Sequence, residues 1–127
     1  TGEFKFFSDH PLVDWHVMGH GFTWETQDKN QDIAAAQKAW ALAETLLKDS
    51  SYDLLVFDEI GYMFKYGYLD TEPVVTALRN RPMMQNVIMT GRTMVTDLQD
   101  IADTISVIQD ERHAFRLGVK AQEGIEF

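Results

Sequence analysis

The chain has 127 residues, of which 45% are hydrophobic and 12% aromatic, which excludes a disordered tail and predicts one globular domain over residues 1–127. Its net charge of −9 argues against a nucleic-acid-binding surface, because affinity for the phosphate backbone needs a basic stripe. The sequence contains no cysteine, no signal peptide and no apolar run near the roughly 18–20 residues that cross a bilayer, so we expect a cytoplasmic protein without membrane contact.

The first part of the chain predicts one strand, one loop and one helix. Apolar and polar side chains alternate over residues 13–18, which predicts a strand that runs into a glycine-containing loop. The loop carries Phe22 and Trp24, which either anchor it to the core or form a platform for a flat ligand. Apolar residues at helical spacing, in alanine-rich sequence, then predict an amphipathic helix from about residue 32 to residue 48.

An acidic pair, Asp58 and Glu59, follows the strand that is predicted over residues 52–57. Its four consecutive apolar residues are too short a run for a helix and indicate a strand buried on both faces of a parallel sheet. In open α/β sheets, ligands bind beyond the carboxyl ends of such strands. The pair is therefore typical of a Walker B element that holds Mg²⁺ against a nucleoside triphosphate. The alternative is a core strand that ends in a solvated acidic turn.

The second half of the chain continues the alternation of helices and strands. An aromatic-rich segment follows, in which we expect most of Met63, Phe64, Tyr66 and Tyr68 to be core. A helix is then predicted over residues 71–80, with Asp70 as its N-cap. Strands are predicted over residues 86–90 and 104–108, with a helix between them at 96–103. This order predicts a layered α/β fold with a mainly parallel sheet.

Arg92 follows the strand predicted over residues 86–90, just as Asp58 and Glu59 follow theirs. If the two strands lie side by side, metal-binding carboxylates and a phosphate-pairing guanidinium face the same crevice. The alternative is that Arg92 is a solvated residue in a strand-to-helix turn.

Several short segments, spread in order over nearly the whole chain, carry a resemblance to a known family. They are residues 21–27 (GFTWETQ), 58–59 (DE) with 62–63 (YM), 81–82 (RP), 87–92 (VIMTGR), 102–104 (ADT), 113–115 (HAF) and 118–125 (GVKAQEGI). With these segments the chain resembles the ATP:corrinoid adenosyltransferases of the bacterial cobalamin pathway.

The resemblance implies a fold, a reaction and a set of partners. The fold would be a three-layer, RecA-like P-loop fold, typically in a homodimer. The reaction would transfer the 5′-deoxyadenosyl group of ATP to cob(I)alamin or a related Co(I) corrinoid and release triphosphate. The implied partners are ATP with Mg²⁺, the corrinoid, and an electron donor such as a reduced flavoprotein.

The resemblance also implies roles for individual residues. Glu59 would be the Mg²⁺ ligand with Asp58 beside it, and Arg92 and Lys120 would pair with the triphosphate. Phe22 and Trp24 would close under the corrin ring and expel the lower axial ligand. A Co(II) centre without axial ligands is easier to reduce to Co(I), and apolar rings exclude the water that would otherwise coordinate it.

The chain departs from the family pattern in one respect, because it contains no Gly-x-x-x-x-Gly-Lys-Ser/Thr sequence to cradle phosphates. We therefore expect it to be the C-terminal majority of an adenosyltransferase whose P-loop strand lies upstream, and to be inactive alone. The alternative is a catalytically inactive P-loop-like module that binds only a corrinoid or only a nucleotide. Equilibrium binding of ATP and of corrinoid separates these hypotheses.

Overall fold

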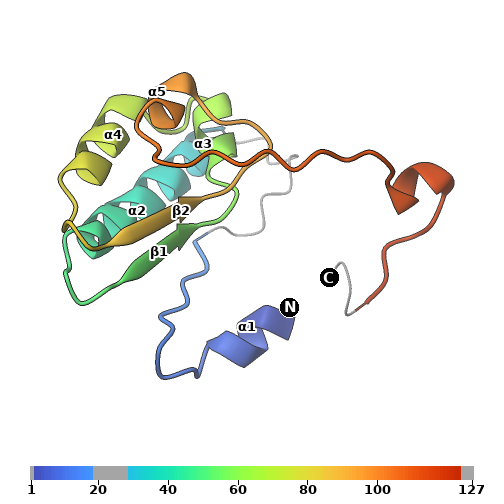
Figure 1. Cartoon of the computed structure of the whole chain (residues 1–127), viewed down its shortest axis with the longest axis horizontal. Helices are drawn as coiled ribbons and strands as arrows, with labels where there is room; N and C mark the ends of the chain where they lie inside the picture. Colours follow the sequence, from blue (N-terminus) through green and yellow to red (C-terminus); the bar gives the residue numbers. More distant parts are fainter. Residues whose placement is uncertain (1, 19–28, 124–127) are drawn as a thin grey trace. The chain divides into compact units, whose positions relative to one another are not determined.

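The computed structural model describes residues 2–18 and 29–123 (Figure 1). They belong to two units. The central unit is Met18–Ile105, and the terminal unit combines Thr1–Val17 with Ser106–Phe127. Each unit is described by itself below.

The central unit contains four helices and two strands among its described residues. In chain order they are α2 (Lys29–Leu47), β1 (Leu54–Phe57), α3 (Gly61–Lys65), α4 (Thr71–Arg79), β2 (Asn86–Met89) and α5 (Thr96–Gln99). The strands pair in parallel, with Leu54 opposite Asn86 and Phe57 opposite Met89. Parallel strands need a crossover connection, which α3 and α4 provide here. The expectation of a small α/β fold with a parallel sheet is confirmed.

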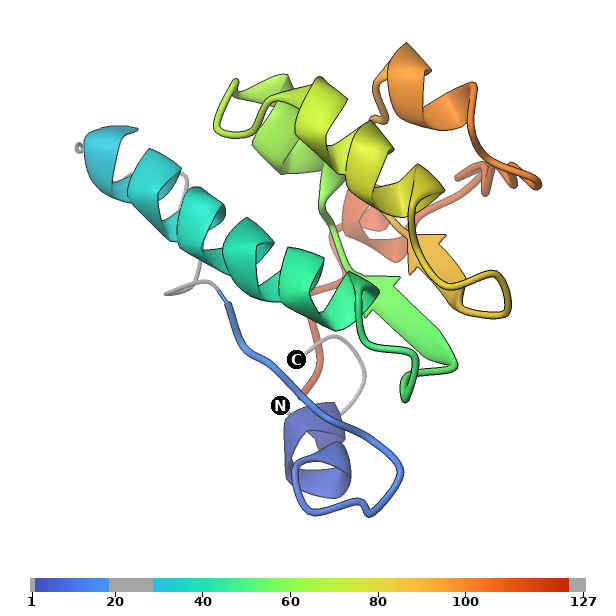
Figure 2. The same ribbon diagram turned by 90° about the vertical axis from the view of Figure 1, so that its left-hand side faces the viewer.

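Helices α2 and α4 cover one face of the sheet (Figure 2). The buried side chains form one core cluster: Trp40 and Leu47 from α2, Leu55 from β1, Val74 and Leu78 from α4, together with Ile60, Phe64 and Leu98. Val74 and Leu78 are one helical turn apart, so they point to the same side of α4. Each fully buried aliphatic or aromatic side chain contributes about 1.5–3 kcal/mol relative to an exposed one.

The opposite face of the sheet is open among the described residues. Leu54 and Val56 of β1 are 50% and 56% exposed, and Ile88 of β2 is 49% exposed. Val56 and Ile88 are paired across the strands, so the three side chains form one apolar surface, which we call the open sheet face. The prediction that β1 is buried on both faces is therefore wrong for the described residues, because an apolar run specifies what a strand could bury and not what covers it.

Four predicted elements are confirmed, with small shifts at their ends. The long helix is α2, the strand before Asp58 is β1, the helix that begins after Asp70 is α4, and the strand before Gly91 is β2. The helix predicted over residues 96–103 is shorter and ends at Gln99. There the Gln99 side chain turns back and donates to the carbonyl oxygen of Met94 at 2.8 Å.

Two predicted strands are absent. Residues 13–18 and 104–108 have no strand pairing, although the second segment is rich in apolar side chains that are largely exposed, such as Val107 at 78% and Ile108 at 98%. Alternating side chains are necessary for a half-buried strand, but a strand also needs a neighbouring edge with which to bond. Neither segment pairs with a strand in the described part of the chain.

The terminal unit contains helix α1 (Gly2–Phe7) and the 3₁₀ helix η1 (Ala114–Leu117). Phe7 stacks on Trp15 with ring centroids 5.7 Å apart. At η1, the Nδ1 atom of His113 accepts from the Phe115 N–H at 3.1 Å, and Gly118 ends the turn with a φ of 77°. No helix in the described ranges is long and apolar enough to cross a membrane.

Candidate functional site

The carboxyl ends of β1 and β2 meet at one edge of the sheet. Phe57 and Met89 are partners in the parallel ladder, and the Thr90 N–H donates to the Phe57 carbonyl oxygen at 3.0 Å. The residues that follow each strand therefore emerge next to one another. They are Asp58 and Glu59 after β1, and Thr90 after β2.

The Thr90 hydroxyl joins the two strand ends. It donates to Asp58 Oδ1 at 2.6 Å and accepts from the Glu59 backbone N–H at 2.9 Å. Sequence reasoning assigned no role to this residue. The available signal was its position, since it directly follows an apolar strand, as Asp58 does, and such positions face each other when parallel strands pair in register.

Glu59 is the one non-glycine residue with a positive φ in the described part of the chain, at 54°. A left-handed conformation costs an L-residue with a Cβ atom roughly 1–2 kcal/mol, and such strain is concentrated at functional sites. The turn redirects the chain from β1 towards Ile60, which is buried, and α3. Glu59 itself is exposed, and its carboxylate has no hydrogen bond or ion pair to any described residue.

Two glycines, Gly61 and Gly91, allow the backbone after β1 and the backbone after β2 to approach closely. Gly61 opens α3 and packs against the loop after β2, where a Cβ atom on it would collide with the carbonyl oxygen of Thr93. A Cβ atom on Gly91 would lie 3.1 Å from the Gly61 nitrogen, which is tighter than ordinary contacts. The backbone that follows the acidic turn (Asp58 and Glu59) therefore contacts the loop that contains Arg92, at Gly91 and Thr93.

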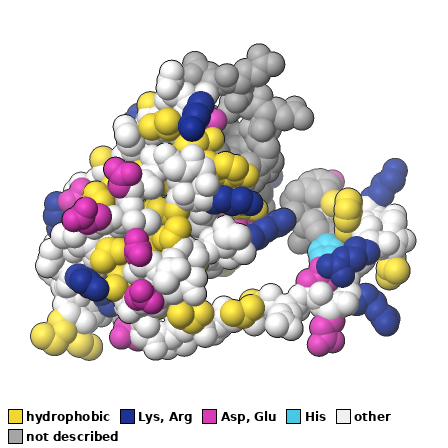
Figure 3. Space-filling view, turned by 90° about the horizontal axis from the view of Figure 1, so that it is seen from above, with side chains coloured by type: hydrophobic (Ala, Val, Ile, Leu, Met, Phe, Trp, Pro, Cys, Tyr) yellow, Lys and Arg dark blue, Asp and Glu magenta, His cyan; other side chains and the backbone are white. Residues whose placement is uncertain are grey.

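Arg92 directly follows Gly91, whose backbone packs against Gly61. It is exposed, and its guanidinium pairs with no described carboxylate. Acidic side chains are spread among apolar ones over the central unit on the face drawn in Figure 3. A polyanion bound at this edge would need positive charge from nearby side chains, of which Arg92 is one.

The remaining predicted site residues are Lys120, Phe22 and Trp24. Lys120 is exposed in the terminal unit, whereas the acidic pair belongs to the central unit. Phe22 and Trp24 lie outside the described residues.

A row of tyrosines follows the acidic turn. The Tyr62 and Tyr66 ring centroids are 6.2 Å apart, and those of Tyr66 and Tyr68 are 5.7 Å apart. Phe64 is buried and Met63 packs against the core, whereas Tyr66 is 39% exposed and is therefore not one of the core residues expected in this segment. The Tyr68 hydroxyl donates to Asp32 Oδ2 at 3.5 Å. Desolvation, helped by the charge of Asp32, raises the pKa of Tyr68.

The oxygen atoms at the acidic turn suit Mg²⁺, which prefers carboxylate, phosphate and water ligands. The described residues contain no group of three or more acidic, histidine or cysteine side chains that could hold a metal ion. Mg²⁺ is often bound through one or two carboxylates together with substrate phosphates. Asp58 and Glu59 offer oxygen ligands of the kind that would hold such a metal–nucleotide complex.

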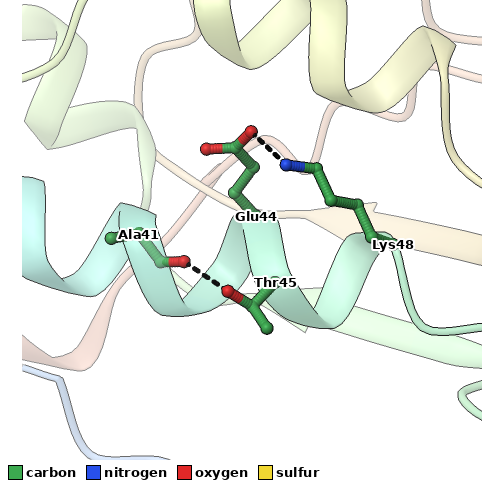
Figure 4. Close-up of polar contacts among 4 residues, drawn as sticks. All are labelled: Ala41, Glu44, Thr45 and Lys48. Carbon is green, nitrogen blue, oxygen red and sulfur yellow. Dashed lines mark hydrogen bonds and ion pairs between the residues drawn. The ribbon is translucent and has the colours of Figure 1, made fainter.

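A hollow of about 480 Å³ between α2 and α4 is a separate feature. Its lining includes Glu44, Lys48 and Glu72, and none of the predicted site residues. Glu44 and Lys48 pair with each other at 2.7 Å, one helical turn apart, while Thr45 donates to the Ala41 carbonyl oxygen at 3.0 Å (Figure 4). These interactions are local to α2 and typical of a solvated helix face.

Comparison with known proteins identifies the family. All of residues 1–127 match the family described as ATP:corrinoid adenosyltransferase BtuR/CobO/CobP. The chain is 46% identical over 128 residues to the corrinoid adenosyltransferase of Pseudomonas aeruginosa, and 45% identical over 127 residues to that of Escherichia coli K12. The corresponding enzyme of a Sinorhizobium species is 39% identical over 130 residues.

These alignments include the whole of this chain but only part of each relative. The chain spans 63% of the Pseudomonas protein, 64% of the Escherichia protein and 61% of the Sinorhizobium protein. Each of these alignments covers the full length of this chain. The chain belongs to the family of ATP:corrinoid adenosyltransferases.

Proposed function

We propose that the chain is part of an enzyme that transfers the 5′-deoxyadenosyl group of ATP to the Co(I) centre of a corrinoid, in cobalamin biosynthesis or salvage. In this reaction a cobalt–carbon bond forms, the bond between C5′ and the triphosphate oxygen breaks, and its electron pair leaves with triphosphate. The observation that carries the proposal is the arrangement at the sheet edge, where parallel pairing brings Asp58, Glu59 and the Arg92 loop together in a chain of this family.

In the proposed site, the chain's own residues position and neutralise a triphosphate. Glu59, with Asp58 beside it, would hold the Mg²⁺ of MgATP. When bound, this ion neutralises charge that develops on the leaving triphosphate. Arg92 would pair with phosphate oxygens through its planar guanidinium, which can donate two parallel hydrogen bonds. Lys120 would add a second positive charge, which matters in a protein of net charge −9.

The corrinoid would be bound by the aromatic loop. Phe22 and Trp24 would close under the corrin ring and displace the lower axial ligand, which makes Co(II) easier to reduce. An electron donor such as a reduced flavoprotein would supply the electron. No protein nucleophile is needed, because Co(I) attacks the ribose carbon in line and the enzyme contributes positioning and charge stabilisation.

We further propose that residues 1–127 form one domain of a three-layer, RecA-like fold, in a cytoplasmic homodimer. The parallel β1–β2 pair with helices on one face corresponds to two of the three layers. The open sheet face is consistent with a third layer, since parallel sheets are normally covered on both faces.

A Glu59→Gln substitution tests the site. The amide keeps the size of the side chain but removes its charge, so we expect kcat for corrinoid adenosylation to fall by about 100-fold and the affinity for Mg²⁺ with ATP to fall with it. The assay uses chemically reduced corrinoid and the natural, full-length form of the enzyme. Far-UV circular dichroism should be unchanged.

The matched control is Glu72→Gln, which removes an exposed carboxylate from the first turn of α4 in the same unit. It should leave turnover unaffected. Near-normal turnover of the Glu59→Gln enzyme would rule out the metal-binding role. A protein that binds corrinoid or ATP but transfers no adenosyl group would be an inactive binding module.

A further inference from the structure

We propose that Thr90 is a positioning residue for the acidic pair: its hydroxyl fixes the carboxylate of Asp58 and the backbone of Glu59 in the geometry that receives a metal–nucleotide complex. The inference rests on the proposed function for the identity of the ligand. Its structural part, the two hydrogen bonds that join the Thr90 hydroxyl to Asp58 and to Glu59, is independent of that function.

Both hydrogen-bonding capacities of the Thr90 hydroxyl are directed towards the acidic turn. Its proton goes to Asp58 Oδ1 at 2.6 Å, a short distance typical of a bond to an ionised carboxylate. One of its lone pairs receives the Glu59 N–H at 2.9 Å. The hydroxyl cannot rotate without losing one of these bonds, so its orientation is fixed by the two partners together.

The first bond determines which part of Asp58 meets a ligand. With Oδ1 engaged by Thr90, the carboxylate is held in one orientation and Oδ2 is left for a metal ion or one of its water ligands. A carboxylate oriented by a hydrogen bond has less freedom to lose when a ligand binds.

The second bond holds the strained backbone. Glu59 keeps a φ of 54° while its N–H is bound to Thr90, which lies 31 residues further along the chain. If the hydroxyl were absent, nothing at this N–H would oppose relaxation of the turn into the favoured right-handed region. Such relaxation would redirect the Glu59 side chain, so Thr90 acts on the proposed ligand through Glu59 as well as through Asp58.

Loss of the hydroxyl should not unfold the central unit. The β1–β2 ladder and the close approach of Gly61 to Thr93 do not involve the Thr90 side chain. Thr90→Val is therefore the informative change, because valine has nearly the shape of threonine without its hydroxyl. Thr90→Ser keeps the hydroxyl and should rescue the wild-type behaviour, and Thr90→Ala removes the hydroxyl without adding a methyl group.

The matched control is Thr71→Val. The Thr71 hydroxyl also donates to an aspartate, Asp97 Oδ2 at 3.0 Å, and it also joins two elements of the central unit, α4 and α5. It differs from Thr90 in lying outside the acidic turn. Any effect that comes only from losing a threonine–aspartate hydrogen bond should appear in both variants.

The first measurement is hydrogen exchange at the Glu59 amide without ligand. We expect the amide to be protected in the wild type, in Thr90→Ser and in Thr71→Val, and to exchange at least about tenfold faster in Thr90→Val and Thr90→Ala. Equal exchange in the wild type and Thr90→Val would overturn the proposal, whatever the enzyme does with corrinoids.

The second measurement is the binding of Mn²⁺ with ATP, followed by electron paramagnetic resonance on the full-length enzyme. Residues that orient metal ligands typically contribute 10–100-fold to affinity, so we expect a loss of about tenfold or more in Thr90→Val, rescue in Thr90→Ser, and no change in Thr71→Val. An unchanged affinity in Thr90→Val, or no binding of Mn²⁺ with ATP by the wild type, would overturn the proposal. If these expectations are met but no adenosyl group is transferred, the positioning role stands and the proposed function fails.

Discussion

Gly61 lies where two backbones approach each other too closely for any side chain. A Cβ atom at this residue would meet the Thr93 carbonyl oxygen, and its neighbour across the contact is another glycine, Gly91. The backbone of Gly61 does not have the positive φ that makes glycine necessary elsewhere, as at Gly67. Space, rather than conformational freedom, therefore requires glycine at this residue.

Gly61→Ala should consequently be destabilising, although alanine is the better helix former. The methyl group meets backbone atoms that cannot rotate away, so we expect a loss of about 1–3 kcal/mol in the free energy of unfolding, measured by urea denaturation. Gly2→Ala is the control, because a Cβ atom on Gly2 meets nothing within 4 Å. Equal stability of the two variants would mean that the loops can separate at little cost.

Among the helices and strands, the turn before β2 supplies hydrogen-bond donors to the C-terminal ends of two helices, α2 and α4. The last carbonyl groups of a helix have no partner within it and need donors from elsewhere. Gln85 is only 3% exposed, and its Nε2 atom donates to the Asp49 carbonyl oxygen at 2.9 Å, just beyond the end of α2. Arg81 donates through Nη1 to the Leu78 carbonyl oxygen in the last turn of α4, at 2.7 Å. The turn thus ties both helices to the sheet that they cover.

Gln85→Glu should weaken this connection. The substitution replaces a donor by a buried carboxylate that faces carbonyl oxygens, and leaving buried polar groups unsatisfied costs about 1–3 kcal/mol or more. Gln99→Glu is the matched control, since Gln99 also donates to a backbone carbonyl but is exposed. Thermal melting at neutral pH should show a clear drop in Tm for the first variant only. The capping role would be wrong if both variants melted alike.

For the molecule as a whole, the open sheet face is an exposed apolar surface on a chain with a net charge of −9. The open sheet face presents three aliphatic side chains that are each about half exposed. Contiguous exposed apolar surface of this kind favours association. The net charge of −9 opposes association by repulsion, but charge repulsion between molecules is screened by salt.

We therefore expect the 127-residue chain to self-associate as salt concentration rises, and Val56→Lys to suppress this association. Sedimentation velocity over a salt series measures both effects. Leu12→Lys is the control, because it adds the same charge at a residue that is 89% exposed in the terminal unit. If the two lysine variants behaved alike, added charge would explain the result and the open sheet face would not.

The sequence allowed the ends of the two strands to be predicted better than the contacts between them. Apolar runs that end in Asp58 and in Gly91 located both strand ends, because those runs are short and closed by polar residues. The bond from Thr90 to Asp58 depends on the register of the two strands, which neither strand encodes alone. Residues 104–108 had the composition of a strand, but no adjacent edge in the described structure pairs with them.

The conformation at Glu59 also has a consequence for how sequences of this family can drift. A φ of 54° is one that glycine or asparagine adopts more readily than glutamate. In a lineage that kept the fold but no longer used the ligand, mutation would tend to replace Glu59 by such residues at no loss of folding. If Glu59 holds the proposed metal ion, selection for its carboxylate would oppose this drift, and a relative with glycine or asparagine here should no longer bind the metal–nucleotide complex.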